Sequence, residues 1–129
     1  MSWDLTSPKA VSDGLLAVLA EWVPGTVSRV AELEGFDTDD VALPHETRGY
    51  RAPTGSLFVT DAPAVWVRVR SGRVLRDDVY ARDVRWAVDV HALVRHQDYE
   101  STAARAGWFA TALAGIVETQ SPFSGTQVN

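Results

Sequence analysis

The chain of 129 residues contains no cysteine and only one methionine. Without cysteine, disulfides and cysteine-ligated zinc sites are excluded, and a reducing environment is permitted. A chain of this length can do without such cross-links, because a single domain of this size buries roughly two thirds of the surface of its unfolded chain. We therefore expect one domain over residues 1–129.

Lysine is almost absent as well: Lys9 is the only one, beside 11 arginines. The net charge is -5, but it is unevenly placed, with ten acids and four bases in residues 1–63 and seven arginines and four acids in residues 64–97. An acidic chain is a poor candidate for binding nucleic acid through its phosphates, which needs clustered positive charge. The central arginines are expected either on a solvated sheet face or on a protein contact surface, where arginine is favoured over lysine.

Long apolar runs are also lacking. No run approaches the roughly 20 residues that a membrane-spanning helix needs. The first residues have no basic segment followed by an apolar one, as a secretory signal would. We expect neither a membrane span nor export by that route.

The first element is predicted to be an amphipathic helix over residues 8–22. Ser7 followed by Pro8 is typical of a helix start, and the apolar residues that follow recur at helical spacing. Pro24 and Gly25 predict the end of this helix, because proline lacks the amide that a helix interior needs. A short strand is expected next, over residues 26–33.

Residues 34–63 form a long inserted loop rich in glycine and proline. Loops of this length are uncommon in compact domains unless they have a function. This one carries too many apolar residues for a solvating linker. It is expected either as an arm that orders against a neighbour or as a flap folded on its own domain.

Two alternating strands and a closing helix complete the prediction. The sheet spans residues 64–93, with a link over 71–83 that is too long for a tight hairpin and allows strand extensions through Val74 and Val79. The helix spans 98–119, with Asp98 as its N-cap and Glu100 in its first turn, and residues 121–129 form a loose tail. The predicted class is α+β: a small, mostly antiparallel sheet packed against an N-terminal and a C-terminal helix, with a long inserted loop.

The core is expected between the second strand and the closing helix. Trp86, Val88 and Val90 should face that helix, and Trp22 and Trp108 are expected in the core or at its edge. The predicted buried face of the closing helix consists of Ala106, Phe109, Ala110, Leu113, Ile116 and Val117.

Catalytic and metal-binding patterns do not assemble. His91 and His96 are five apart, a spacing that places both rings on one face of neither a helix nor a strand, and no cysteine completes a metal set. The acidic run from Asp37 resembles the start of a calcium loop, but Ala42 and Arg48 stand where that loop needs glycine and glutamate. No nucleophile, base and orienting group occur together. We therefore expect no enzyme, no cofactor and no metal.

The order of elements carries a resemblance. The chain begins with a helix ending in Pro-Gly, a strand and a long insertion. Then come the strand Pro-Ala-Val-Trp-Val-Arg-Val-Arg from Pro63, the strand Arg-Trp-Ala-Val-Asp-Val-His-Ala from Arg85 and an alanine-rich helix. Over about residues 8–118 this resembles the tail terminator (tail completion) proteins of long-tailed bacteriophages. The loop is longer than that family's plan.

The resemblance implies a structural virion protein: a homo-oligomeric ring, expected as a hexamer, that caps the tail tube, ends its polymerisation and joins it to the head-tail connector protein. It implies a place in the tail-neck region of the virion after assembly in the host cytoplasm, with DNA passing through unbound and no membrane contact. The family carries no catalytic residues over to this chain.

Two sets of site residues are inferred here from the residues themselves. The expected subunit or partner interface consists of Phe36, Tyr50, Phe58, Trp66, Arg68, Arg70, Arg73 and Arg76. A ring lumen that repels phosphate would be lined by acids, for which the candidates are Glu32, Glu34, Asp37, Asp39 and Asp40.

Two alternatives stay open. Within the same class, the chain could be another head-to-tail joining protein, a stopper or connector. From a different class, it could be a cytoplasmic ligand-binding or enzymatic α+β domain, which would need a pocket with converging polar groups.

Overall fold

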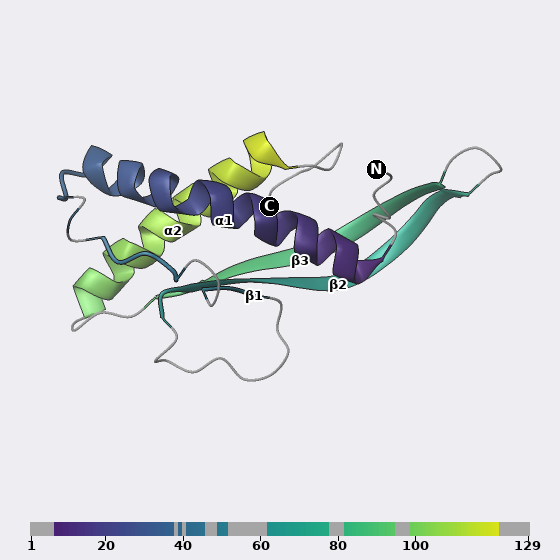
Figure 1. Cartoon of the computed structure of the whole chain (residues 1–129), viewed down its shortest axis with the longest axis horizontal. Helices are drawn as coiled ribbons and strands as arrows, with labels where there is room; N and C mark the ends of the chain where they lie inside the picture. The colour runs from purple at the N-terminus through teal and green to yellow at the C-terminus, as the bar shows by residue number, and fades with distance from the viewer. Residues whose placement is uncertain are drawn as a thin grey trace.

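The protein has two helices on one side of a small sheet, as the α+β prediction required (Figure 1). The computed structural model describes residues 7–37, 39, 41–45, 49–51, 62–77, 82–94 and 99–121. Strands β2 and β3 pair antiparallel, and the two-residue strand β1 pairs parallel to β2 at the sheet edge. The elements are α1 (Pro8–Leu33), β1 (Tyr50–Arg51), β2 (Ala64–Asp77), β3 (Arg82–Leu93) and α2 (Tyr99–Gln120).

Helix α1 begins where the sequence predicts. Ser7 is the N-cap, and its Oγ accepts the backbone N–H of Ala10 at 3.1 Å, while Pro8 occupies the first turn. A four-residue repeat advances by about 40° per step around a helix of 3.6 residues per turn, so the buried stripe winds around α1. This lets one helix contact both β2 and α2. The stripe consists of Val11, Leu15, Leu19, Val23, Val27 and Ala31.

The predicted end of this helix is wrong. The chain passes through Pro24 and Gly25 without leaving the helix, and residues 26–33 are helical, not a strand. Val27 and Ala31 continue the buried stripe and are fully buried. Tertiary packing therefore outweighs the local signal of a proline, because burial of one apolar side chain contributes about 1.5–3 kcal/mol.

The helix ends at Leu33, two residues after its last buried residue, at a Schellman motif. Gly35 has a φ of +88°, which glycine adopts without strain. Its N–H donates to the Glu32 carbonyl at 3.0 Å, and the Phe36 N–H donates to the Ala31 carbonyl at 2.9 Å. The stop signal is therefore Glu34-Gly35, not Pro24-Gly25.

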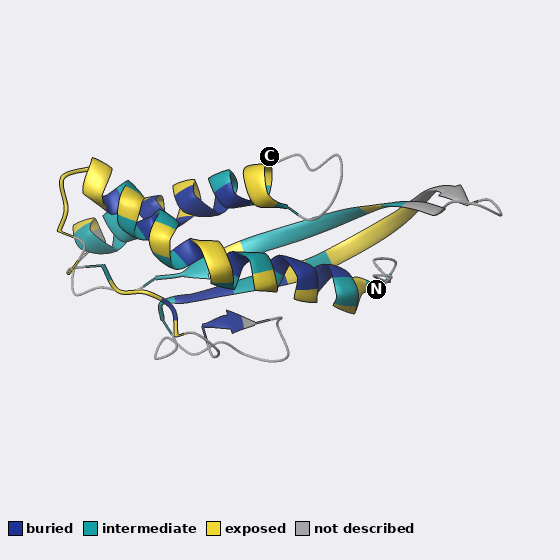
Figure 2. Cartoon of the chain, turned by 45° about the horizontal axis from the view of Figure 1, so that its top comes forward, coloured by how far each residue is buried: buried dark blue, intermediate teal, exposed yellow. Residues whose placement is uncertain are grey.

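At 26 residues, α1 is long and apolar enough to cross a membrane by length and composition alone, contrary to the expectation from short runs. The core helix of a globular domain meets the same criteria. Here the apolar stripe of α1 packs against α2 and the sheet (Figure 2). We therefore describe α1 as a core helix.

The hairpin is longer than predicted. Strand β2 continues to Asp77 and β3 begins at Arg82, so most of the expected link over 71–83 is strand, interrupted by irregularities between Val69 and Ser71 and between Val74 and Arg76. The extension expected through Val74 is confirmed, whereas Val79 lies outside the described residues. The hairpin projects beyond the helices (Figure 1).

The described parts of the inserted loop fold on their own domain. Pro44, Gly49 and Tyr50 are buried, and Val41 packs against the core. The Gly49 carbonyl accepts the N–H of Val65 in β2. The alternative of an arm finds no support in these residues, and the projecting element is the hairpin. The segments 46–48 and 52–61 lie outside the described residues.

The core joins α1, α2 and one face of the sheet, and Val88, Val90 and Trp86 pack against it as the alternation predicts. The face of α2 is partly different from the prediction. Phe109, Leu113 and Ile116 are buried as predicted, and Trp108, expected in the core or at its edge, is fully buried. Ala106 and Ala110, however, are exposed. Small side chains satisfy helical periodicity on either face, so their pattern does not identify the buried one. Glu100 lies in the first turn as expected, and Asp98 lies outside the described residues.

Trp86 lies directly over Gly72, its cross-strand partner. A Cβ at Gly72 would stand 2.5 Å from Cζ3 of the indole, closer than van der Waals contact allows. We expect Gly72→Ala to lower the free energy of unfolding by about 1–3 kcal/mol through overpacking, measured by urea denaturation.

The matched control is Gly107→Ala, because nothing lies within 4 Å of a Cβ built there. In the interior of α2 that change is expected to stabilise by roughly 0.5–1 kcal/mol. Equal stabilisation by the two substitutions would show that the packing of Trp86 does not require the absence of a side chain at Gly72.

Candidate functional site

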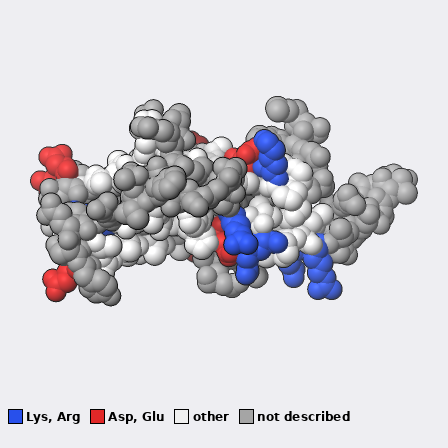
Figure 3. All heavy atoms as spheres, turned by 90° about the horizontal axis from the view of Figure 1, so that it is seen from below, with Lys and Arg blue, Asp and Glu red and all other residues white. Residues whose placement is uncertain are grey.

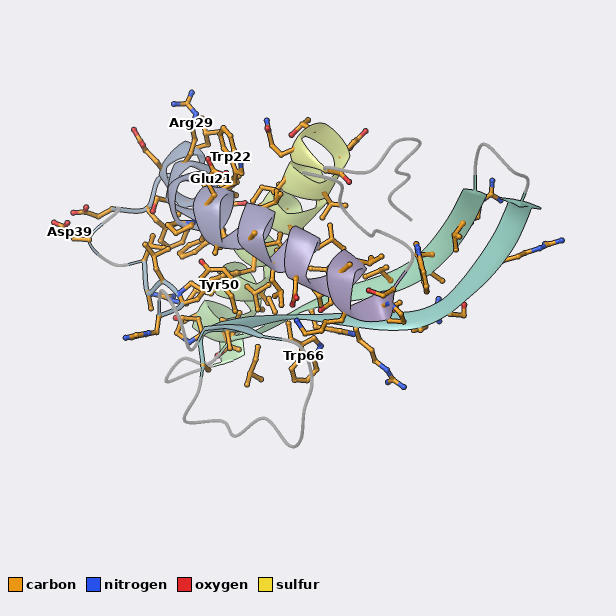
Figure 4. All side chains as sticks on the ribbon, turned by 45° about the vertical axis from the view of Figure 1, so that its right-hand side comes forward. Glu21, Trp22, Arg29, Asp39, Tyr50 and Trp66 are labelled. Carbon is orange, nitrogen blue, oxygen red and sulfur yellow. The ribbon has the colours of Figure 1, made fainter. Side chains whose placement is uncertain are left out.

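The candidate site is the sheet face that the helices leave uncovered. Strand alternation sends the valines of β2 and β3 toward the helices and the polar side chains away from them. Figure 4 shows Trp66 on the side of the sheet opposite α1. We call this surface the arginine face and define it by Trp66, Arg68, Arg70, Arg73, Arg85, Asp89 and His91.

In the part of this face near β1, the side chains of β2 have partners on β3. Trp66 stands opposite His91 in the register, with their rings edge to face at 5.3 Å. Arg68 stands opposite Asp89, and Arg70 forms an ion pair with Asp89, Nε to Oδ1, at 3.3 Å. Both partners are partly exposed, so this pair contributes little to stability.

Nearer the end of the hairpin, two like charges face each other across the strands. Arg73 stands directly opposite Arg85, and both are exposed. Like charges directly opposite each other on one face of an antiparallel pair are destabilising. Nearer to β1 the register is complementary, with Arg68 opposite Asp89. Among the side chains that the structure describes, neither Arg73 nor Arg85 forms an ion pair.

The other end of the molecule is acidic. Helix α1 ends there, and Figure 4 shows Asp39 pointing outward at this end. Glu32, Asp37 and Asp39 are all exposed. The Asp39 N–H donates to Oδ1 of Asp37 at 3.1 Å and stabilises a local turn. Two exposed apolar side chains accompany these acids, Leu33 at 75% and Phe36 at 42% exposure. We call these five residues the acidic end.

Figure 3 shows how the charges separate along the molecule. Lysine and arginine gather toward the hairpin side with some acidic side chains beside them, and two further groups of acidic side chains lie at the opposite end. This separation is the main electrostatic feature of the described surface.

Trp108 connects α2 to the end of α1. Its Nε1–H donates to Oε2 of Glu34 at 2.6 Å, and Phe36 packs against it edge to face at 4.8 Å between ring centres. The guanidinium of Arg105 lies over the same indole, 5.2 Å from its centre. Glu34, expected in the lumen, and Phe36, expected at the interface, therefore both have a role within the chain. The signal available in the sequence was Trp108 itself, because a buried indole N–H needs a hydrogen-bond acceptor.

The structure also places most of the remaining residues that the sequence analysis singled out. Trp66, Arg68, Arg70 and Arg73 share the arginine face. Tyr50 is a correction, since it is buried in the core, where desolvation raises its pKa to about 12, and it cannot reach a partner. Trp22, expected at the core, is instead 41% exposed on α1. Outside what the structure describes lie Phe58, Asp40, His96 and the side chain of Arg76.

The described residues contain no group of three or more His, Asp or Glu side chains that could hold a metal ion. Comparison with protein-family models, with curated proteins and with solved structures gives no match. The functional argument therefore depends on the residues and surfaces of this chain.

Proposed function

We propose that the protein is a structural component of a bacteriophage tail, of the tail terminator kind. Six copies form a ring that caps the finished tail tube, ends its polymerisation and joins it to the head-tail connector. The ring lies in the tail-neck region of the virion, and DNA passes through it without specific binding.

One observation carries this proposal: an arginine-rich sheet face on a hairpin that projects past the body, opposite an acidic end. Exposed arginine and tryptophan are enriched at protein interfaces. Surfaces of opposite charge at opposite ends suit a subunit that contacts its own copies, and rotation between head-to-tail contacts closes a ring. Of the elements that carry the resemblance to tail terminators, the N-terminal helix, the hairpin and the closing helix are present, whereas the helix end at Pro24-Gly25 and the strand over 26–33 are not.

The first test is the oligomeric state. Native mass spectrometry and light scattering after size exclusion are expected to give a hexamer, and negative-stain images a ring. Mixed with the polymerising tail tube protein, the ring should bind one end of each tube and stop its growth. Only monomers at every concentration, together with unchanged tube lengths, would refute the proposal.

A further inference from the structure

We infer that the arginine face of one copy binds the acidic end of a second copy, in a head-to-tail contact. This inference rests on the proposed function and names the surfaces by which the subunits of the ring meet. The occupant of the arginine face is thus a set of carboxylates on a neighbouring chain.

The first argument is the charge that each surface leaves unmatched. Of the four arginines on the face, only Arg70 forms an ion pair with another described residue. The exposed arginines Arg73 and Arg85 oppose each other across the strands, which costs free energy in the isolated subunit. Carboxylates from outside the chain would relieve that repulsion.

The acidic end has the complementary property. Glu32, Asp37 and Asp39 are exposed, and none of them forms an ion pair with another described residue. Asp37 and Asp39 are held close together by their turn, so their like charges also gain from an external cation. Each surface therefore has what the other lacks.

The second argument is the position of the two surfaces. The arginines lie toward the projecting hairpin, whereas α1 ends on the other side of the body (Figures 1 and 3). One chain cannot bring them together, but two chains can. A contact between different surfaces repeats from copy to copy and closes when the rotation allows, in agreement with a ring.

The third argument is the apolar content of both surfaces. Trp66 lies partly exposed on the arginine face, and Leu33 and Phe36 are exposed at the acidic end. Interfaces typically combine aromatic anchors with a charged rim. The contact assigned here has both. It also places the acids against the arginines of a neighbouring subunit, whereas the sequence analysis expected them to line the lumen.

The experiment uses two charge-reversal variants of the full chain. Arg73→Glu with Arg85→Glu inverts the arginine face and keeps a like-charge cross-strand pair, so folding of the subunit is preserved. Glu32→Lys with Asp39→Lys inverts the acidic end at exposed positions. Circular dichroism and thermal melting verify that both variants fold.

Each variant alone is expected to lose assembly by at least about 100-fold in dissociation constant, since like charges then meet at every contact. An equimolar mixture is expected to recover assembly. In an alternating ring, the inverted arginine face meets the inverted acidic end, and the two native surfaces meet each other. Native mass spectrometry should therefore find equal numbers of the two variants in each assembly.

Matched controls reverse single exposed charges elsewhere: Glu21→Lys on α1 and Glu118→Lys on α2. Both should assemble like the wild type. The single change Arg73→Glu adds an internal check, because it converts the like-charge pair into a complementary one. It should raise the melting temperature of the dilute monomer by about 3 °C while weakening assembly.

The outcomes separate the two claims. A wild type that stays monomeric overturns the proposed function and this contact with it. A wild type that assembles while the reversed variants also assemble alone, or while their mixture fails to recover, overturns the contact and leaves the ring standing. In that second case the acids at the end of α1 are available as the lining of the lumen.

Discussion

Replacing Trp108 with alanine is expected to lower the free energy of unfolding by about 3–5 kcal/mol, the usual cost of removing a large aromatic side chain from a core. Trp108 is fully buried, and it connects α2 to the end of α1 through its bond to Glu34 and its contact with Phe36. Its loss therefore leaves a cavity and releases the last turn of α1. Equilibrium unfolding in urea, followed by circular dichroism, measures the effect.

Trp22→Ala is the matched control, since Trp22 is 41% exposed and carries the same side chain. Trp22→Ala is expected to lower the free energy of unfolding clearly less than Trp108→Ala. Glu34→Ala should lower the free energy of unfolding by about 1–3 kcal/mol, because it leaves the buried indole N–H of Trp108 without its acceptor. If Trp108→Ala were no worse than Trp22→Ala, the connection between the two helices would not be a main source of stability.

Replacing Pro24 with alanine is expected to stabilise the protein, by up to about 3 kcal/mol, which is the cost of proline in a helix interior relative to alanine. Pro24 lies inside α1 and has no N–H to donate to the carbonyl one turn earlier. Its substitution restores that hydrogen bond and removes a steric conflict. Thermal and urea unfolding of the monomer provide the measurement.

Gly25→Ala accompanies this change as a comparison, because a Cβ at Gly25 would meet nothing within 4 Å. It is expected to add roughly 0.5–1 kcal/mol. A loss of stability in Pro24→Ala, with the expected gain in Gly25→Ala, would mean that the proline directs the two halves of α1 onto their separate partners. The expectation of simple stabilisation would then be wrong.

The predictions that held depend on neighbours in sequence. Ser7 and Pro8 start α1 by chemistry local to one turn, and the alternation of β2 and β3 assigns valines to one face and arginines to the other. A sheet with one apolar face needs cover, so the α+β class and the two helices follow from pattern alone. The arginine face was therefore available from the sequence as a surface.

The predictions that failed depend on distant partners. Whether Pro24 ends a helix is decided by the free energy gained when Val27 and Ala31 reach the core, which lies far along the chain. The same holds for Tyr50, which is buried in the core where β1 pairs with β2. The burial of Trp108 was expected, but its acceptor is 74 residues away and was not.

The sequence by itself determined the class of fold, the start of α1, the two faces of the hairpin and the uneven charge. Only the tertiary structure decided how far α1 runs, that Ala106 and Ala110 lie outside the buried side of α2, and that Arg73 opposes Arg85 while the acids gather at the other end. The reason is physical: periodicity and capping act over a few residues, whereas burial and charge pairing act between segments that only the folded chain brings together.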